Sequence, residues 1–566
     1  MEPKPAVEHL SLHVIGLMCV LPFLAPHHRL PIPGFYGELT AFALGMLAMC
    51  TFWQKAVLAS FQLPRITLLP FGILCIILLQ TALGMIAYPQ QALLGMLYLL
   101  WACLLMALGY HLRGALGWEK LATTLAWFLV AGGLLNTVMT GLQYAGVKTI
   151  WLLPKIAVQS FGNLGQPNHF ANYMALATAS LAYLLARNAL PRLAFPVLAT
   201  GFLAALALSG SRSGWLYLAV FFILAIIRSR RVAAAENRRL ILACLALLPM
   251  FAAIQSLLHW LLPLWNSTPH LLPTEHFFQQ VNSASIRWRL WRDALHMLME
   301  QPWLGVGHGQ FAWNSFLLAS THAAGEFSNP AEHAHNLLLN LLAEQGIFAG
   351  LLLIGLGWIW IKQATAEKLT LERWWMWAML AVLGIHSMLE YPLWYSYFLG
   401  IAAILLGAGE TRVLRPDLSR IGRPALAAML GLGFCSMIAL AQSYGTLEHW
   451  VTRAMSHTLK DSELPAFNQA MLSLHRKSLL TPYVELIYAI SLPANRENLD
   501  DKLAITGKAL RFAPGSTVAY QYAELLAQHG DLAGARQQLA LTRSAYPNDM
   551  PRHREKLIAA GLDPGP

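Results

Sequence analysis

The stretch QALLGMLYLLWACLLMALGY, residues 91–110, decides the class of fold because it carries no charged side chain. A helix of that length is about 30 Å long, which matches the hydrocarbon core of a bilayer. The composition of the whole chain also fits a lipid environment: of 566 residues, 57% are hydrophobic and 12% are charged. An ordinary soluble domain has roughly 25% charged residues. We therefore predict an all-α, polytopic membrane protein.

Similar apolar stretches recur on both sides of this one, and together they predict about thirteen membrane spans. The predicted spans are 10–26, 36–53, 67–87, 91–110, 121–145, 168–186, 193–208, 214–227, 240–262, 336–361, 374–388, 393–409 and 425–443. No small-residue cleavage pattern closes the first, which favours a retained helix over a signal peptide. All six cysteines lie in these spans, so we expect no disulfide framework in the exposed regions.

The loops between the predicted spans fall into a basic and a less basic set. One alternate set contains most of the lysines and arginines, whereas the other short loops contain only Arg29, Lys148, Lys155 and Arg212. Cytoplasmic loops carry the basic excess, so the N-terminus is predicted to be cytoplasmic and the C-terminal segment periplasmic, in a bacterial inner membrane. The net charge of +11 is then largely a topology signal and does not require a nucleic-acid partner.

Two exported regions are long enough to have their own structure, the loop 263–335 and the tail 444–566. The prediction is a transmembrane domain over residues 1–443, including the loop, followed by a periplasmic helical domain over the tail. The run from Ala519 to Pro547 looks like a tetratricopeptide (TPR) unit, although an unspecialised helical hairpin would read similarly. Prolines are expected to interrupt the helices of the tail at Pro493, Pro514 and Pro547.

The exported segment SFGNLGQPNHFANY, residues 160–173, crowds polar side chains at a helix entrance. Helix capping explains one such residue. It does not explain the group Asn163, Gln166, Asn168 and His169, nor Asn172 one turn inside the membrane, where an unpaired amide is costly. These residues are therefore candidates for a functional site.

Arginines stand out in two exported segments. Arg212 lies in SGSRSGW, residues 209–215, and its small, hydroxyl-bearing neighbours suit recognition of a phosphate. A membrane-anchoring arginine is the alternative. Arg287 and Arg289 lie in SIRWRLWRDAL, residues 285–295, which equally fits an amphipathic helix at the membrane surface.

The segment EHAHNLLLNLLAEQG, residues 332–346, returns the exported loop to the membrane. Asn336, Asn340 and Glu344 recur every fourth residue, so they share one helix face, which is expected to point into the helix bundle. His335 stands at the mouth of that helix, where a neutral imidazole can accept a proton near pH 7. A metal site with its neighbours, or a histidine that only caps the helix, are the alternatives.

The last exported turn, HSMLEYPLWYSY, residues 386–397, has two readings. Its aromatic residues, including Tyr391 and Tyr395, fit an interfacial belt. The belt does not account for His386 and Glu390, which lie four residues apart at membrane depth, where ionisable groups are candidates for function.

These segments together resemble the bacterial O-oligosaccharyltransferases that glycosylate pilins, within the O-antigen ligase and polymerase superfamily. The resemblance rests on FGNLGQPNHFANY, SRSGW, the R-x-W…P-x-L-G-V-G-x-G-x-F run from Arg289 to Phe311, AHNLLLNLLAEQGI and HSMLEYPLWYSYFLG. It covers most of residues 10–443 and, more loosely, the tail. The resemblance implies a GT-C-like membrane fold that transfers a glycan from undecaprenyl diphosphate to serine or threonine hydroxyls of an exported protein such as a pilin.

The same resemblance implies roles for individual residues. His335 matches the essential histidine of the family, Arg212 and Arg289 match basic positions thought to hold the diphosphate, and Gln166 and Tyr395 fall in motifs tied to activity. Arg287 is a further candidate beside Arg289. Because the leaving group is already a diphosphate, arginines can take the place of a metal ion, so we expect no cofactor, no metal, and inversion at the anomeric carbon.

Three alternatives share many of these features. An O-antigen ligase would use lipid A-core as acceptor, but its His-Asn, nine residues, Gly-x-x-Glu pattern is only partly met, since Ala349 replaces the glutamate. An O-antigen polymerase would use a second lipid-linked glycan. A lipid-linked glycan flippase would be expected to place polar residues near the midplane and on both faces, whereas the candidates here gather at one face.

Overall fold

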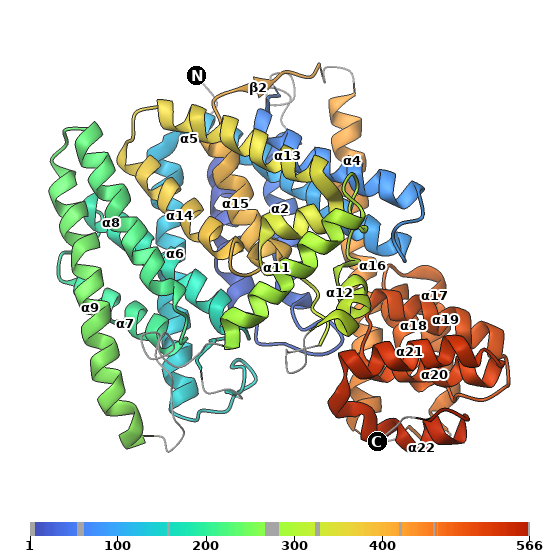
Figure 1. Ribbon diagram of the computed structural model, residues 1–566. Helices are drawn as coiled ribbons and strands as arrows, with labels where there is room; N and C mark the ends of the chain where they lie inside the picture. Colours follow the sequence, from blue (N-terminus) through green and yellow to red (C-terminus); the bar gives the residue numbers. More distant parts are fainter. Residues whose placement is uncertain are drawn as a thin grey trace. The chain divides into compact units, whose positions relative to one another are not determined.

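The computed structural model of the protein describes residues 6–53, 61–155, 159–265, 282–322, 329–417, 421–456, 459–460 and 462–563. Helices form nearly all of the regular structure in these ranges (Figure 1). Two short strands, β1 (Leu63–Pro64) and β2 (Val413–Leu414), pair antiparallel. The predicted helical class is therefore confirmed for the described residues.

The chain forms two compact units. The first unit contains residues 1–70, 100–280 and 355–437, and the second contains residues 71–99, 281–354 and 438–566. Helices α4 (Leu68–Ala82), α5 (Pro89–Tyr144), α13 (Leu337–Ala366) and α16 (Gly422–Ser456) contribute residues to both units.

Helix α6 (Pro167–Ala186) forms the centre of the first unit, and almost all of its side chains are buried. It packs against α7, α9 and α14, and its many alanines allow the neighbouring helices to approach closely. The other elements of this unit are α1 (Ala6–Met18), η1 (Leu21–Leu24), α2 (Phe35–Met49), η2 (Cys50–Trp53), η3 (Arg65–Thr67), α7 (Ala194–Leu208), α8 (Ser213–Arg231), α9 (Glu236–Trp265), α14 (Leu371–Ser387), η5 (Pro392–Trp394) and α15 (Ser396–Gly409).

Eight helical segments among the described residues are long and apolar enough to cross a membrane, and α7 and α15 are shorter apolar helices. These helices support the predicted membrane protein. Each of the thirteen predicted spans overlaps helical structure, although the number of crossings remains a prediction. Two predicted spans fall in the single element α5, which is broken at Gly117, where φ is 80°.

The second unit combines the exported loop with the tail. The loop contributes α11 (Asn282–Glu300), α12 (Phe311–Leu318) and η4 (Ala319–Thr321), and the tail contributes α17 (Leu464–Lys477), α18 (Thr481–Ser491), α19 (Leu499–Phe512), α20 (Ser516–His529), α21 (Leu532–Ala545), η6 (Pro547–Asp549) and α22 (Met550–Ala559). Phe316 and Ala319 of the loop share a buried core with Val518, Ala519 and Ala545 of the tail.

The helices of the tail end where the prolines predict. Pro493 lies between α18 and α19, Pro514 between α19 and α20, and Pro547 after α21. Gly530 ends α20 with a φ of 96°, and the Asp531 side chain caps α21. Helix α16 runs without a break through position 443, where the sequence predicted a domain boundary.

Candidate functional site

Two polar segments that are far apart in the sequence meet in the first unit. Gln166 occupies the N-cap of α6, and its side-chain oxygen accepts a hydrogen bond from the His169 backbone N–H. The Asn168 side-chain amide donates to Glu390 Oε1 at 2.9 Å. Glu390 is only 4% exposed. A cap explains Gln166, but the Asn168–Glu390 bond joins two of the sequence-predicted candidate groups.

The imidazole of His169 is buried among other rings. Its ring centroid lies 4.9 Å from that of Tyr395, 5.5 Å from that of Tyr391 and 5.3 Å from that of His386. His386 Nδ1 in turn lies 3.0 Å from the hydroxyl of Tyr217. We call Gln166, Asn168, His169, Tyr217, His386, Glu390, Tyr391 and Tyr395 the α6 cluster. Sequence reasoning missed Tyr217, whose only signal was a hydroxyl in an apolar helix.

Arg212 precedes Tyr217 of this cluster by five residues in the sequence. It occupies the N-cap position of α8, with a helical φ of −63°. Tyr217 of the α6 cluster lies in the first turns of the same helix. The start of α8 therefore carries both the predicted phosphate-binding arginine and a member of the cluster.

In the second unit, His335 has an unusual backbone conformation. Its φ is 51°, in the left-handed region that residues other than glycine seldom adopt. The residues around it are fixed: the Ala334 N–H donates to Asn340 Oδ1, and Asn336 Oδ1 accepts from the Leu339 N–H at the start of α13. Strained residues of this kind persist where their surroundings hold them, often at active sites.

Asn340 and Glu344 are 1% and 2% exposed, so the part of the predicted stripe that they form is buried as expected. Asn336, the third member, acts as a helix cap. Its place among the active-site candidates remains a prediction.

Arg289 is buried on α11, with a side chain only 3% exposed. One of its guanidinium nitrogens donates to the Asn329 carbonyl at 3.1 Å, and another lies 4.0 Å from the Asp293 carboxylate. Asp293 also contacts His322 at 3.1 Å. Arg287 lies on the same helix and is partly exposed. The interior of the second unit therefore holds Arg289 in place, and Arg287 is the more accessible of the two arginines.

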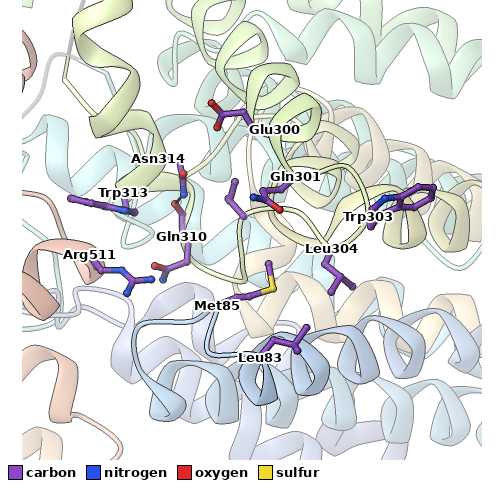
Figure 2. A pocket seen from close by; sticks show the side chains of 11 residues that line it. Leu83, Met85, Glu300, Gln301, Trp303, Leu304, Gln310, Trp313, Asn314 and Arg511 are labelled. Atoms are coloured by element: carbon purple, nitrogen blue, oxygen red, sulfur yellow. Dashed lines mark hydrogen bonds between the residues drawn. The ribbon is translucent and has the colours of Figure 1, made fainter.

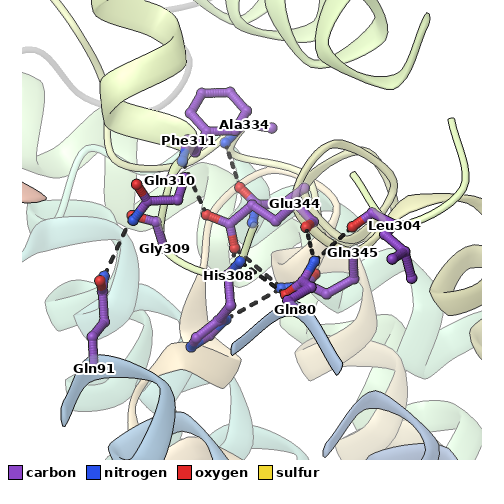
Figure 3. A network of polar contacts seen from close by, with 11 residues as sticks. Gln80, Gln91, Leu304, His308, Gly309, Gln310, Phe311, Ala334, Glu344 and Gln345 are labelled. Atoms are coloured by element: carbon purple, nitrogen blue, oxygen red, sulfur yellow. Dashed lines mark hydrogen bonds and ion pairs between the residues drawn. The ribbon is translucent and has the colours of Figure 1, made fainter. Parts of the chain in front are cut away.

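Glu344 is the centre of a polar network in the second unit (Figure 3). Its carboxylate accepts from the Phe311 N–H at the start of α12, at 3.3 Å, and from the Gln345 side chain, also at 3.3 Å. His308 Nδ1 lies 3.8 Å from the Glu344 carboxylate and 3.2 Å from the Gln345 amide. A carboxylate at a helix N-terminus is stabilised by the backbone N–H groups there.

Gln80 of α4 completes this network (Figure 3). Its side-chain amide donates to the backbone carbonyls of Leu304, at 2.6 Å, and Glu344, at 2.7 Å. Its side-chain oxygen accepts from the backbone N–H of His308 at 3.0 Å. Sequence reasoning missed both Gln80 and His308. A fully buried amide in an otherwise apolar span was the signal that could have found Gln80.

The glycines of the G-V-G-x-G run allow the loop to lie against α13. Gly305, Gly307 and Gly309 all have positive φ, and a Cβ on Gly305 would lie 2.4 Å from the Glu344 backbone. Helix α13 is itself broken at Gly346, where a Cβ would lie 2.2 Å from the Trp303 carbonyl oxygen. The motif therefore serves close backbone contact, which only glycine permits.

Two histidines near this network are held in the neutral form. Burial lowers the pKa of His308 to about 4. Burial, followed by the charges of His335 and His308, lowers the pKa of His333 to about 3. Both rings are therefore uncharged at neutral pH.

An open cavity of about 620 Å³ lies beside this network within the second unit (Figure 2). Leu83, Met85, Leu304 and Val306 supply apolar lining, and the amides of Gln301, Gln310 and Asn314 supply polar lining, together with Glu300, Trp303, Trp313 and Arg511. The side chain of Gln310 is 1% exposed, and its oxygen has no hydrogen-bond partner among the described residues.

The structure thus groups the predicted residues within each unit. Gln166, Asn168, His169, Glu390, Tyr391 and Tyr395 meet in the α6 cluster of the first unit, beside the helix that Arg212 begins. His335, Asn336, Arg287 and Arg289 belong to the second unit.

Three family models match successive parts of this chain. A protein glycosylation ligase model matches residues 161–185, an O-antigen ligase model matches residues 197–354, and a model of the C-terminal part of a membrane-bound polymerase described as a virulence factor matches residues 374–557. The first two contain the start of α6, Arg212 and His335. These matches indicate the class of membrane-bound glycan ligases and polymerases.

Two curated proteins of Acinetobacter baylyi are similar over most of the chain. The general O-oligosaccharyltransferase is 23% identical over 560 residues, which are 96% of this chain and 94% of the relative. The ComP-specific O-oligosaccharyltransferase is 24% identical over 421 residues, 73% of each chain. Both relatives are glycosyltransferases, so the prediction of an O-oligosaccharyltransferase-like glycosyltransferase is confirmed.

Proposed function

We propose that this protein transfers an oligosaccharide from undecaprenyl diphosphate to serine or threonine hydroxyls of exported proteins such as a pilin. The similarity to O-oligosaccharyltransferases over 96% of the chain carries this proposal. The apolar helices are long enough to cross a bilayer, which is where a lipid-linked donor is dissolved. The basic excess in alternate loops supports an inner-membrane protein with a cytoplasmic N-terminus and a periplasmic tail.

In the proposed reaction, His335 accepts the proton of the acceptor hydroxyl as its oxygen attacks the anomeric carbon. The bond from that carbon to the diphosphate oxygen breaks, and its electron pair leaves with the diphosphate. Arg212, Arg287 and Arg289 stabilise the negative charge that grows on the leaving group. One displacement of this kind inverts the configuration at the anomeric carbon. The positive φ of His335, fixed by ordered neighbours on both sides, supports a positioned base.

The α6 cluster is proposed to support the same reaction. Glu390 accepts a hydrogen bond from Asn168, and His169 packs against Tyr395, so side chains from both motifs are ordered before substrate arrives. Preorganised polar groups of this kind are what acyl or glycosyl transfer requires of a site.

The test uses purified protein reconstituted in liposomes with a lipid-linked oligosaccharide and three separate acceptors: a pilin, lipid A-core and a second lipid-linked glycan. We expect transfer to the pilin, and we expect it to survive a chelator. The ligase and polymerase family models keep two other acceptors open. Transfer only to lipid A-core, or only to the second glycan, would replace the proposed acceptor.

The base is tested with His335→Asn rather than with alanine alone. Asparagine tolerates the left-handed conformation of this position but cannot act as the base, so the backbone is preserved. We expect transfer to fall about 10²–10⁴-fold. The control is His296→Asn, which removes a partly exposed imidazole from α11. Activity in His335→Asn equal to that of the control would rule out His335 as the base.

A further inference from the structure

A second polar cavity lies entirely within the first unit, where α6 and α8 end and α9 and α14 begin. Its volume is about 400 Å³. Four cationic side chains and two carboxylates line it: Arg187, Arg228, Arg239, Lys368, Glu236 and Glu372. Its lining loops belong to the basic set that the charge count assigns to the cytoplasm, opposite to the side of the proposed reaction.

Two of the four cations are already paired. Arg187 forms ion pairs with Glu372, at 2.6 Å, and with Glu119. Arg228 forms an ion pair with Glu236 at 2.7 Å. These pairs use both carboxylates of the lining.

The other two cations form no ion pair of their own, although the charge of Arg239 acts on the Glu236 carboxylate. Within the ranges that the structure describes, neither Arg239 nor Lys368 takes part in an ion pair, yet both line the cavity. The four cations face the two carboxylates of the lining and Glu119, which pairs with Arg187 from outside it, so one positive charge is in excess. An anion in the cavity would balance that excess.

Arg228 gives an independent indication of a bound acceptor. Its side chain is 1% exposed, and its Nε–H has no hydrogen-bond partner among the described residues. A buried donor without an acceptor is costly, and this donor belongs to a residue of the cavity wall. An acceptor oxygen beside the Arg228 guanidinium would satisfy it.

Two helix starts add to the same potential. The lining includes Ala234 and Glu236 at the start of α9, and Thr370 and Leu371 at the start of α14. Helix N-termini present unpaired backbone N–H groups and a partial positive charge, which favour phosphate and similar anions.

We propose that this cavity binds a phosphate group, supplied by the headgroup of an anionic phospholipid or by soluble phosphate. A phosphate offers several oxygens at once and can accept from an arginine, an ammonium group and backbone N–H groups together. A site between helix ends on the basic side of a membrane protein is placed to meet anionic headgroups. The proposal does not depend on the glycosyltransferase reaction.

The test compares two double variants of the full-length protein that remove the same charge. Arg239→Gln with Lys368→Gln alters the cavity, whereas Arg230→Gln with Arg238→Gln alters exposed residues of the same region that do not line it. Lipid retained after detergent washing is counted by native mass spectrometry, for protein taken from phosphatidylglycerol, cardiolipin or phosphatidylcholine nanodiscs. Radiolabelled inorganic phosphate is offered separately to protein in phosphatidylcholine nanodiscs.

We expect the wild type and the exposed-site variant to retain the anionic lipids, and the cavity variant to retain about tenfold less. Loss of anionic lipid in the cavity variant alone identifies a headgroup. Saturable binding of inorganic phosphate that the cavity variant alone loses identifies a soluble ligand. Equal binding of both probes by the two variants would overturn the proposal.

Discussion

At the scale of single residues, backbone conformation distinguishes His335 from the other histidines of its segment. Its left-handed φ and the hydrogen bonds of Ala334 and Asn336 fix the backbone that carries its imidazole. His308 and His333, in contrast, are kept neutral by burial. The folded second unit therefore contains two neutral imidazoles whose protonation it opposes.

We predict that acidification destabilises the second unit. The unfolded chain binds a proton on His308 near the ordinary pKa of 6.5, whereas the folded chain does so only near pH 4. Between these values the unfolded state holds more protons, so stability falls as the pH drops from 6.5 to 4. At pH 5 this costs about 2 kcal/mol.

The measurement is the melting temperature of the purified protein, followed by tryptophan fluorescence between pH 7 and pH 5. His308→Gln should flatten part of this decline, whereas His449→Gln, which replaces an exposed imidazole, should not. An unchanged decline in His308→Gln would contradict the explanation.

At the scale of elements, the breaks in long helices shape the candidate site. Helix α13 departs from helical geometry at Gly346, with φ 73° and ψ −170°, a combination that is essentially restricted to glycine. The break lies where the chain of residues 302–307 hydrogen-bonds to α13, through the N–H groups of Val306, Gly307 and Ile347. Glu344 is positioned two residues before it.

We predict that Gly346→Ala disrupts this junction. The new Cβ would meet the Trp303 carbonyl oxygen at 2.2 Å in a backbone conformation that alanine disfavours, with a cost of more than about 2 kcal/mol. Melting temperature and glycan transfer should both fall.

Gly355→Ala is the matched control, because it lies in the same helix and its Cβ would meet nothing within 4 Å. It should be neutral or slightly stabilising. Equal behaviour of the two variants would show that the break does not support the site.

At the scale of the whole molecule, a buried carboxylate joins the tail to the start of α5 inside the second unit. Glu485 accepts from the Tyr88 hydroxyl at 2.6 Å and from His475 at 2.9 Å. Lys508 lies 3.8 Å from the same carboxylate and 4.2 Å from the centre of the Tyr88 ring. Glu485 on α18 therefore links Tyr88 to His475 on α17 and to Lys508 on α19.

We predict that Glu485→Ala loosens the tail. Removing one member of a buried polar group leaves the Tyr88 hydroxyl without its acceptor, and we expect a loss of about 2 kcal/mol or more. Limited proteolysis should cut the tail faster than in the wild type. Glu497→Ala, at an exposed position, is the control, and similar cleavage rates for the two variants would contradict the proposed junction.

The apolar stretches, the basic excess in alternate loops, the buried stripe of Asn340 and Glu344, and the prolines that end the tail helices are all local patterns. The sequence was sufficient for them because hydrophobic period, loop charge and backbone restriction are properties of neighbouring residues. Pro167 marked the start of α6 for the same reason, because proline favours the first position of a helix. The sequence did not identify Gln166 as the residue that caps it.

Only the tertiary structure showed that Asn168 bonds Glu390, that Tyr217 bonds His386, and that Gln80 joins α4 to the loop and α13. The tertiary structure alone also showed that Arg228 lines a cavity whose walls carry more positive than negative side chains. These partners lie tens to hundreds of residues apart. Which distant side chains meet depends on how the helices pack, and no periodicity along one chain segment encodes that.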